Sequence, residues 1–142
     1  MNNINYNVLH TKPPKKIYKK ARKYFGEDIV DFDKGTTFTI GDTIYCKIDI
    51  PRDLLPHELV HVRQQTEMGW RKWWKKYFKD AEFRYSQEIE AYRKQYQWIK
   101  NNVKDKNTQN RYLIFYAKSL SGKLYGNLKT YEEALKEVIN KQ

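Results

Sequence analysis

The segment LLPHELVHVRQQTEMG, residues 54–69, constrains the fold more than any other part of the chain. Leu55, Leu59 and Val62 lie at positions i, i+4 and i+7, which is the spacing of one apolar stripe along an α-helix. Asp53 stands where the N-cap of such a helix is expected. Because a buried stripe fixes the rotation of a helix, it also determines where every other side chain of the segment points.

Two histidines and a glutamate share this predicted helix. His57 and His61 are four residues apart, so their imidazoles project from one face and can take two adjacent positions of a tetrahedral zinc. Glu58 would lie beside that metal, where it can take a proton from a zinc-bound water and pass it to a leaving amine. A shuffled chain with three histidines contains an H-E-x-x-H pattern with a probability of roughly 0.004. The alternative is a solvated helix face that carries these three side chains by chance.

A mononuclear zinc requires a third protein ligand, and two carboxylates of the sequence are candidates for it. Glu88 and Glu90 both lie in the later segment QEIEAYRKQ. Two residues apart on a helix, they project about 200° from each other and cannot share one role. The remaining histidine, His10, stands in the N-terminal segment and does not extend the HELVH pattern.

HELVH followed by EIEA resembles the gluzincins, zinc peptidases in which HExxH on one helix is completed by the first Glu of an E-x-x-A pattern on a later helix. The resemblance covers about residues 36–95. The same stretch is similar to small metallopeptidase-like proteins of bacteriophages and bacteria. It implies that Glu88 is the third ligand, with Ala91 allowing the two helices to approach, and Glu90 stays the alternative. The pattern departs at Tyr92, where family members often have an Asp or Asn that accepts a hydrogen bond from a ligand histidine.

The resemblance also implies a residue that stabilises the oxyanion, usually a His or Tyr beyond the third ligand. Tyr125, in the loop SGKLYGN, is the first candidate, and Tyr112 and Tyr116 are its rivals. In peptidases of this fold an edge strand ahead of the metal helix pairs with an extended substrate. Residues 36–40 or 43–50 would form that strand here.

The elements around this centre are expected to be mainly helical. TTFTI and TIYCKIDI are rich in β-branched and aromatic residues and are separated by Gly41-Asp42, which predicts two antiparallel strands joined by a tight turn. A short strand at 29–32 is compatible with the pattern. Helices are expected over 15–25, 70–80, 81–102 and 111–120, and from about Thr130, with Thr130 as the N-cap. The expected fold class is therefore α+β, mainly helical and zincin-like, with a small antiparallel sheet before the HExxH helix.

A chain of 142 residues is long enough for one domain. We expect a single metallopeptidase-like domain over 1–142, with an N-terminal arm at 1–12, a catalytic core at 36–95 and a helical C-terminal extension at 107–142. The lone cysteine, Cys46, excludes an intrachain disulfide and suggests a reducing compartment. No stretch approaches the roughly 20 apolar residues that span a bilayer, so the protein is expected to be soluble and cytoplasmic, with virion association as an alternative.

The formal net charge of +11 attracts anions and raises two further functions. One is nonspecific binding of nucleic acid, with the rings of WRKWWKKYFKD stacking on bases; the opposite interpretation places Trp70, Trp73 and Trp74 over the core with lysines outward. The other is a noncatalytic structural or binding protein held together by metal, such as a phage particle component. The favoured prediction is a zinc-dependent peptidase with a peptide or protein substrate; the sequence leaves its oligomeric state open.

Overall fold

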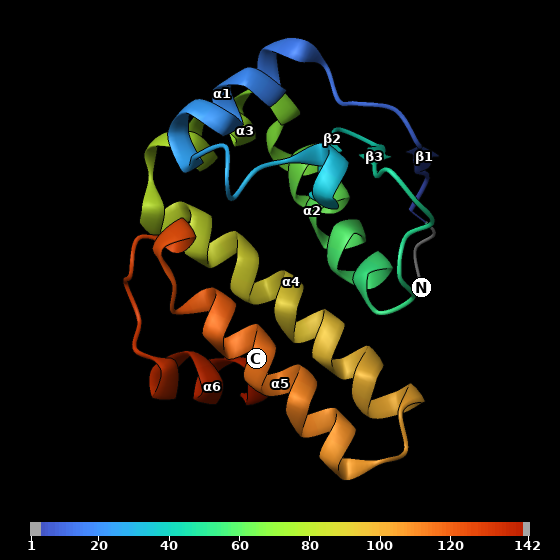
Figure 1. The fold of residues 1–142 in the computed structure, drawn as a ribbon, viewed down its shortest axis with the longest axis vertical. Coiled ribbons are helices and arrows are strands. Elements are labelled where there is room, and N and C mark those ends of the chain that lie inside the picture. The colour runs from blue at the N-terminus through green and yellow to red at the C-terminus, as the bar shows by residue number, and fades with distance from the viewer. Residues whose placement is uncertain (1–3, 141–142) are drawn as a thin grey trace.

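The computed structural model describes residues 4–140, which form six α-helices, two 3-10 helices and three short strands (Figure 1). The fold is α+β and mostly helical, as predicted. In chain order the elements are β1 (Asn7–Leu9), α1 (Lys15–Phe25), η1 (Phe32–Lys34), β2 (Phe38–Ile40), β3 (Thr43–Tyr45), α2 (Leu54–Met68), α3 (Trp70–Lys79), α4 (Ala81–Asn102), α5 (Lys106–Leu120), η2 (Lys123–Tyr125) and α6 (Tyr131–Ile139).

The sheet is mixed, whereas the sequence predicted a purely antiparallel one. β2 and β3 form the expected antiparallel hairpin, and Gly41 in its turn adopts a φ of +62°, which favours glycine. β1 comes from the predicted N-terminal arm and pairs parallel to β3, with Val8 opposite Ile44. The order β1-β3-β2 leaves β2 at one edge. A strand of three residues is too short to show an alternating pattern, which is why the sequence did not reveal β1.

Other predicted boundaries are wrong as well: β2 begins at Phe38, two residues after the predicted start, and α3 ends at Lys79, one residue early. The segment at 29–32 forms no strand and leads into the 3-10 helix η1, which Asp31 caps by accepting a hydrogen bond from the Asp33 backbone N–H. β3 ends at Tyr45 and does not continue to residue 50. α5 begins at Lys106, five residues before the predicted start, because the Asp105 side chain caps it. By contrast, Thr130 caps α6 as expected, in a capping box with Glu133.

Figure 1 shows α4 running through the middle of the molecule, with α1, α3 and the sheet on one side and α5 and α6 on the other. Each side has its own apolar cluster: one is built on the rings of Trp73, Trp74 and Phe78, the other on Leu113, Leu120 and neighbouring side chains. α2 packs along α4 and also contacts α3 and β2. Among residues 4–140, no helix is both long and apolar enough to cross a lipid bilayer.

The apolar stripe predicted on α2 is only partly buried. Val62 is buried, but Leu55 and Leu59 are only partly buried. The buried face of this helix instead carries mostly polar side chains, namely His57, Glu58, His61, Gln64 and Gln65. Buried polar groups are tolerated where they bind one another, so this face identifies the part of the core in which polar contacts are concentrated.

Candidate metal centre

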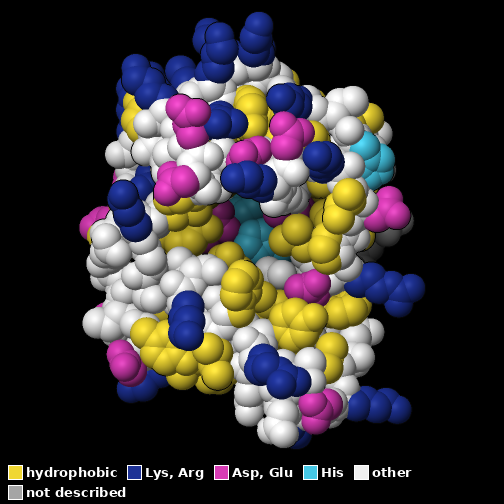
Figure 2. All heavy atoms as spheres, viewed as in Figure 1, with side chains coloured by type: hydrophobic (Ala, Val, Ile, Leu, Met, Phe, Trp, Pro, Cys, Tyr) yellow, Lys and Arg dark blue, Asp and Glu magenta, His cyan; other side chains and the backbone are white. Residues whose placement is uncertain are grey.

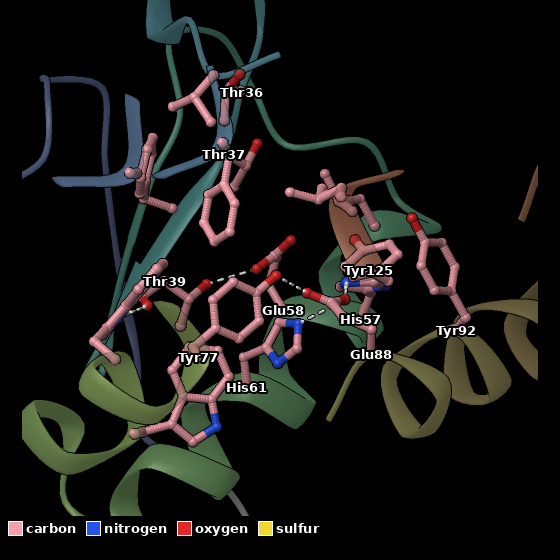
Figure 3. Close-up of a pocket in the computed structure, with 18 of the residues that line it drawn as sticks. Thr36, Thr37, Thr39, His57, Glu58, His61, Tyr77, Glu88, Tyr92 and Tyr125 are labelled. Carbon is pink, nitrogen blue, oxygen red and sulfur yellow. Dashed lines mark hydrogen bonds and ion pairs between the residues drawn. The ribbon is translucent and has the colours of Figure 1, made fainter. Parts of the chain in front are cut away.

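Three buried side chains from two helices meet at one point. His57 and His61 project from α2, and Glu88 projects toward them from α4 (Figure 3). The Nε2 atoms of the two histidines lie 3.1 and 3.2 Å from the same Glu88 oxygen, Oε1. The structure therefore brings together the two histidines of the HELVH pattern and the first glutamate of EIEA.

The donor set fits a tetrahedral zinc. Zinc binds histidine nitrogens and carboxylate oxygens at about 2.0–2.2 Å, which separates two ligands of a tetrahedral site by roughly 3.3 Å. The two Nε2–Oε1 distances are close to that value, and the three ligand atoms all lie within 4.8 Å of one another. Two nitrogens and one oxygen from buried side chains form a three-ligand set that leaves a fourth position for water or substrate.

The other nitrogen of His57 is held by a chain of hydrogen bonds. Its Nδ1 donates to Gln95 Oε1 at 2.9 Å, and Gln95 Nε2 donates to Asp53 Oδ2 at 2.8 Å. Tyr116 donates to the same Asp53 oxygen. Asp53 was predicted to cap α2, but its side chain makes no cap hydrogen bond and instead links α2 to α4 and α5. The chain of bonds fixes the tautomer of His57, so that Nε2 faces Glu88.

His61 has a matching support on its own helix. Its Nδ1 donates to Gln64 Oε1 at 2.8 Å, and the Gln64 amide donates in turn to the backbone carbonyl of Gln87 and to a carboxylate oxygen of Glu90. Glu90 is exposed and also pairs with Arg63. Glu90, the alternative ligand, therefore lies outside the histidine cluster and takes part in its outer support.

Glu88 binds one further group. Its second oxygen accepts a hydrogen bond of 2.5 Å from the hydroxyl of Tyr77. Burial on its own would raise the pKa of Glu88, but the charge on His61 and the contacts with both histidines hold that pKa well below its ordinary value. Burial likewise opposes the charged form of His61, yet Glu88 raises the pKa of His61 to about 9. In the metal-free protein, a proton on His61 balances the charge of Glu88.

Glu58 is placed beside this cluster and not within it. It is 6% exposed, and Thr39 of β2 donates to its Oε1 from Oγ1 at 2.7 Å. Figure 3 shows the carboxylate of Glu58 between Thr39 and Glu88. The hydroxyl of Thr39 therefore orients the Glu58 carboxylate, which the HELVH pattern predicts to be the general base.

The cluster forms the floor of a pocket of about 310 Å³. Figure 2 shows the hollow in this face of the molecule, with histidine at its base and hydrophobic side chains around it. The walls come from α1, the segment before β2, β2 itself, α3, α4 and η2. Part of the wall is apolar and buried, formed by Ala21, Val30, Phe38, Trp73 and Trp74. A side chain or small ligand can thus reach the three ligand atoms from solvent.

Only one of the three predicted oxyanion candidates reaches this pocket. Tyr125, in η2, is 5% exposed and lines the pocket, and burial and the charge of Glu88 raise its pKa well above the ordinary value. Tyr116 is engaged with Asp53, and Tyr112 packs against Tyr116. Tyr92, which the sequence marked only as a departure from the gluzincin pattern, also lines the pocket. Its ring makes a T-shaped contact with the imidazole of His57.

The edge of β2 is partly closed. The backbone carbonyl of Thr39 accepts hydrogen bonds from the Gln65 amide at 2.7 Å and from the Trp74 indole at 3.1 Å. The N–H of Gly41 donates to the Gln65 side-chain oxygen. The stretch from Thr39 onward is therefore already paired with α2 and α3, while Thr36 and Thr37 line the pocket.

Four supporting residues escaped the sequence analysis: Thr39, Gln64, Tyr77 and Gln95. Thr39, Tyr77 and Gln95 stand at no spacing from HELVH that indicates their role, because packing between elements sets their positions beside the cluster. Gln64 offered the nearest signal, since it lies three residues after His61 and so on the same helix face. Comparison with models of protein families, with curated proteins and with solved structures finds no match to this chain, so its function must be inferred from the geometry of this centre.

Proposed function

We propose that this chain is a zinc-dependent peptidase of the gluzincin type, with a zincin-like arrangement, which hydrolyses amide bonds of a peptide or protein. The observation that carries the proposal is the convergence of His57, His61 and Glu88 on the floor of an open pocket beside Glu58. Zinc bound by three such ligands supplies a Lewis acid that polarises a carbonyl and lowers the pKa of water to about 7.

The residues around the ligands suit amide hydrolysis. The Glu58 carboxylate, oriented by Thr39, is positioned to accept a proton from the attacking water and to deliver it to the leaving nitrogen. The raised pKa of Tyr125 keeps its hydroxyl protonated, so that it can donate a hydrogen bond to an oxyanion in the pocket. The hydrogen bond from Tyr77 holds Glu88 in place from the side opposite the histidines.

The walls of the pocket suggest a substrate class. The N–H of Thr36 is bonded to the Asp31 carbonyl and the β2 edge is closed from Thr39 onward, so main-chain pairing with a substrate would be confined to the few groups between them. The apolar wall, which includes Val30, Phe38 and Trp74, favours an apolar side chain next to the scissile bond. We therefore expect cleavage of short peptides or exposed chain ends beside an apolar residue.

A noncatalytic protein held together by metal, such as a component of a phage particle, is the second candidate. The dense hydrogen bonding that links α2, α3 and α4 through the histidines and Glu88 favours it. Such a protein would need the same three ligands but no base beside them. The two candidates therefore differ in whether Glu58 matters.

Metal content is the first test. Protein purified without a His tag should contain about one zinc per chain by elemental analysis. Glu88→Ala should abolish this zinc, and Glu90→Ala, which alters only the outer support, should retain it. Absence of zinc from the wild type after reconstitution would refute both the peptidase and the metal-stabilised candidate.

Turnover is the second test. Glu58→Gln should keep its zinc and lose at least about 100-fold in cleavage of a mixed-sequence peptide library, since it removes a general base. Glu67→Gln, which changes an exposed carboxylate on the same helix, is the matched control and should leave cleavage unchanged. Equal cleavage by both variants would exclude Glu58 as the base, whereas no cleavage by the zinc-loaded wild type would favour the structural candidate.

A further inference from the structure

The net positive charge of this protein arises from two helices. α1 and α3 together carry eleven lysines and arginines and no acidic residue. The rest of the chain has 17 basic and 17 acidic side chains and is therefore neutral overall. The whole excess of +11 belongs to these two helices, whereas a general solubilising charge would be spread over the surface.

The two helices lie side by side. The ring of Tyr24, in α1, stacks on that of Phe78, in α3, with centroids 5.2 Å apart. Figure 2 shows Lys and Arg side chains gathered over this end of the molecule, where Figure 1 places α1 and α3. Ten of the eleven basic residues are exposed and form what we call the basic face: Lys15, Lys16, Lys19, Lys20, Lys23, Arg71, Lys72, Lys75, Lys76 and Lys79.

Each helix presents a regular row of charge. Lys15, Lys19 and Lys23 repeat every four residues on α1, and Arg71, Lys75 and Lys79 repeat in the same way on α3. Four residues of helix rise about 6 Å, so each row places three cations along about 12 Å. Two such rows on adjacent helices form an extended cationic surface, which suits a polymer with regularly spaced negative charges.

The aromatic side chains of α3 point away from this surface. Trp73, Trp74 and Tyr77 are buried, with Trp73 only 2% exposed. Only Trp70 of this helix leaves part of its ring accessible, so the burial of the other rings disfavours stacking of single-stranded bases on α3. A membrane surface is also disfavoured, because the one large hydrophobic side chain of α1 and α3 that is exposed is Tyr24, and it is stacked on Phe78.

We propose that the basic face binds the phosphate backbone of duplex nucleic acid without reading its sequence. A duplex presents one negative charge per about 1.7 Å of its axis, and the ten exposed cations of two adjacent helices that carry no acidic residue complement such a dense line of charge. The face is distinct from the metal centre, since α1 and α3 turn their opposite sides, Ala21, Phe25 and Trp73 among them, to the pocket. The proposal does not depend on peptidase activity.

Fluorescence anisotropy with a labelled 30-base-pair duplex tests the proposal over a range of salt concentrations. The test variant replaces Lys15, Lys19, Lys72 and Lys75 by glutamine. We expect its affinity at low salt to fall at least tenfold, and the slope of log K against log salt to decrease by about three to four, since each phosphate contact contributes close to one. Two unrelated duplex sequences should bind the wild type equally.

The matched control removes the same charge elsewhere, by glutamine at Lys104, Lys118, Lys123 and Lys136, which are all exposed and lie outside α1 and α3. It should retain the affinity of the wild type within about threefold, and so should Glu58→Gln. An equal loss in the control and the test variant would overturn the proposal, because binding would then follow net charge alone. Tighter binding to single strands, or to vesicles containing phosphatidylserine, than to the duplex would overturn it as well.

Discussion

The adjacent helices α2 and α3 arrange their polar residues in opposite ways. α3 turns Trp73, Trp74 and Tyr77 inward and its lysines outward, as amphipathic helices of globular proteins do. α2 buries two histidines, two glutamines and a glutamate, while Leu55 and Leu59 are only partly buried. The two helices therefore have different roles. α3 supplies hydrophobic stabilisation, whereas α2 uses its buried positions for polar groups that must be oriented and shielded from solvent.

The contrast predicts that α3 contributes more to stability. Trp73→Ala should lower the free energy of unfolding by about 3–5 kcal/mol, because it empties a buried site and removes the indole hydrogen bond to Gln87. Urea denaturation followed by circular dichroism measures this. Trp70→Ala, at a partly exposed position of the same helix, should cost less than about 1 kcal/mol. Equal costs would mean that α3 is not held by its inward face.

The buried charge of α2 predicts an unusual pH dependence of the metal-free protein. The pKa of His61 is raised from 6.5 to about 9 by Glu88, so the folded state binds this proton more tightly than the unfolded state. The resulting stability is fully present below pH 6.5 and is lost as the pH rises toward 9, by at most about 3 kcal/mol. Thermal unfolding in the presence of a chelator should show the loss. Glu88→Gln should flatten the profile above pH 6.5; a wild-type profile already flat there would contradict the pairing.

The support of His57 can be removed without touching a ligand. Gln95→Met leaves His57 Nδ1 and Asp53 without their shared partner, which should cost about 1–3 kcal/mol of stability. Zinc affinity, measured by competition with a chelating dye, should weaken by about 10–100-fold. Gln97→Met, at an exposed position of the same helix, should change neither quantity. Unchanged zinc affinity in Gln95→Met would show that the chain of hydrogen bonds does not orient the histidine.

The smallest effect is expected on the outer side of α3. Lys72→Gln and Lys75→Gln should each change the free energy of unfolding by less than about 0.5 kcal/mol, because both side chains are exposed. The same denaturation assay applies. A larger loss of stability in either variant would show that the outward side of α3 is also structural, which would weaken the contrast with α2.

Much of the helical framework could be predicted from the sequence. α1 and α4 have their expected boundaries, and α6 begins after its expected cap, since each shows an apolar period of about 3.6 residues or a clear start and stop signal. The placement of His57, Glu58 and His61 on one helix followed from their spacing alone. β1 and the early start of α5 were missed because three residues show no period and the first turn of α5 is polar.

The sequence by itself determined which functional groups the protein has: two histidines and a glutamate on one helix, two neighbouring carboxylates on a later helix, and a large positive charge. Only the tertiary structure decided how these are used. The packing of α4 on α2 placed Glu88 against the histidines and Glu90 outside, and the adjacency of α1 and α3 gathered the charge on one face. The physical reason is that spacing along a helix sets only which residues share a face, whereas the group that meets this face depends on contacts between elements distant in the chain.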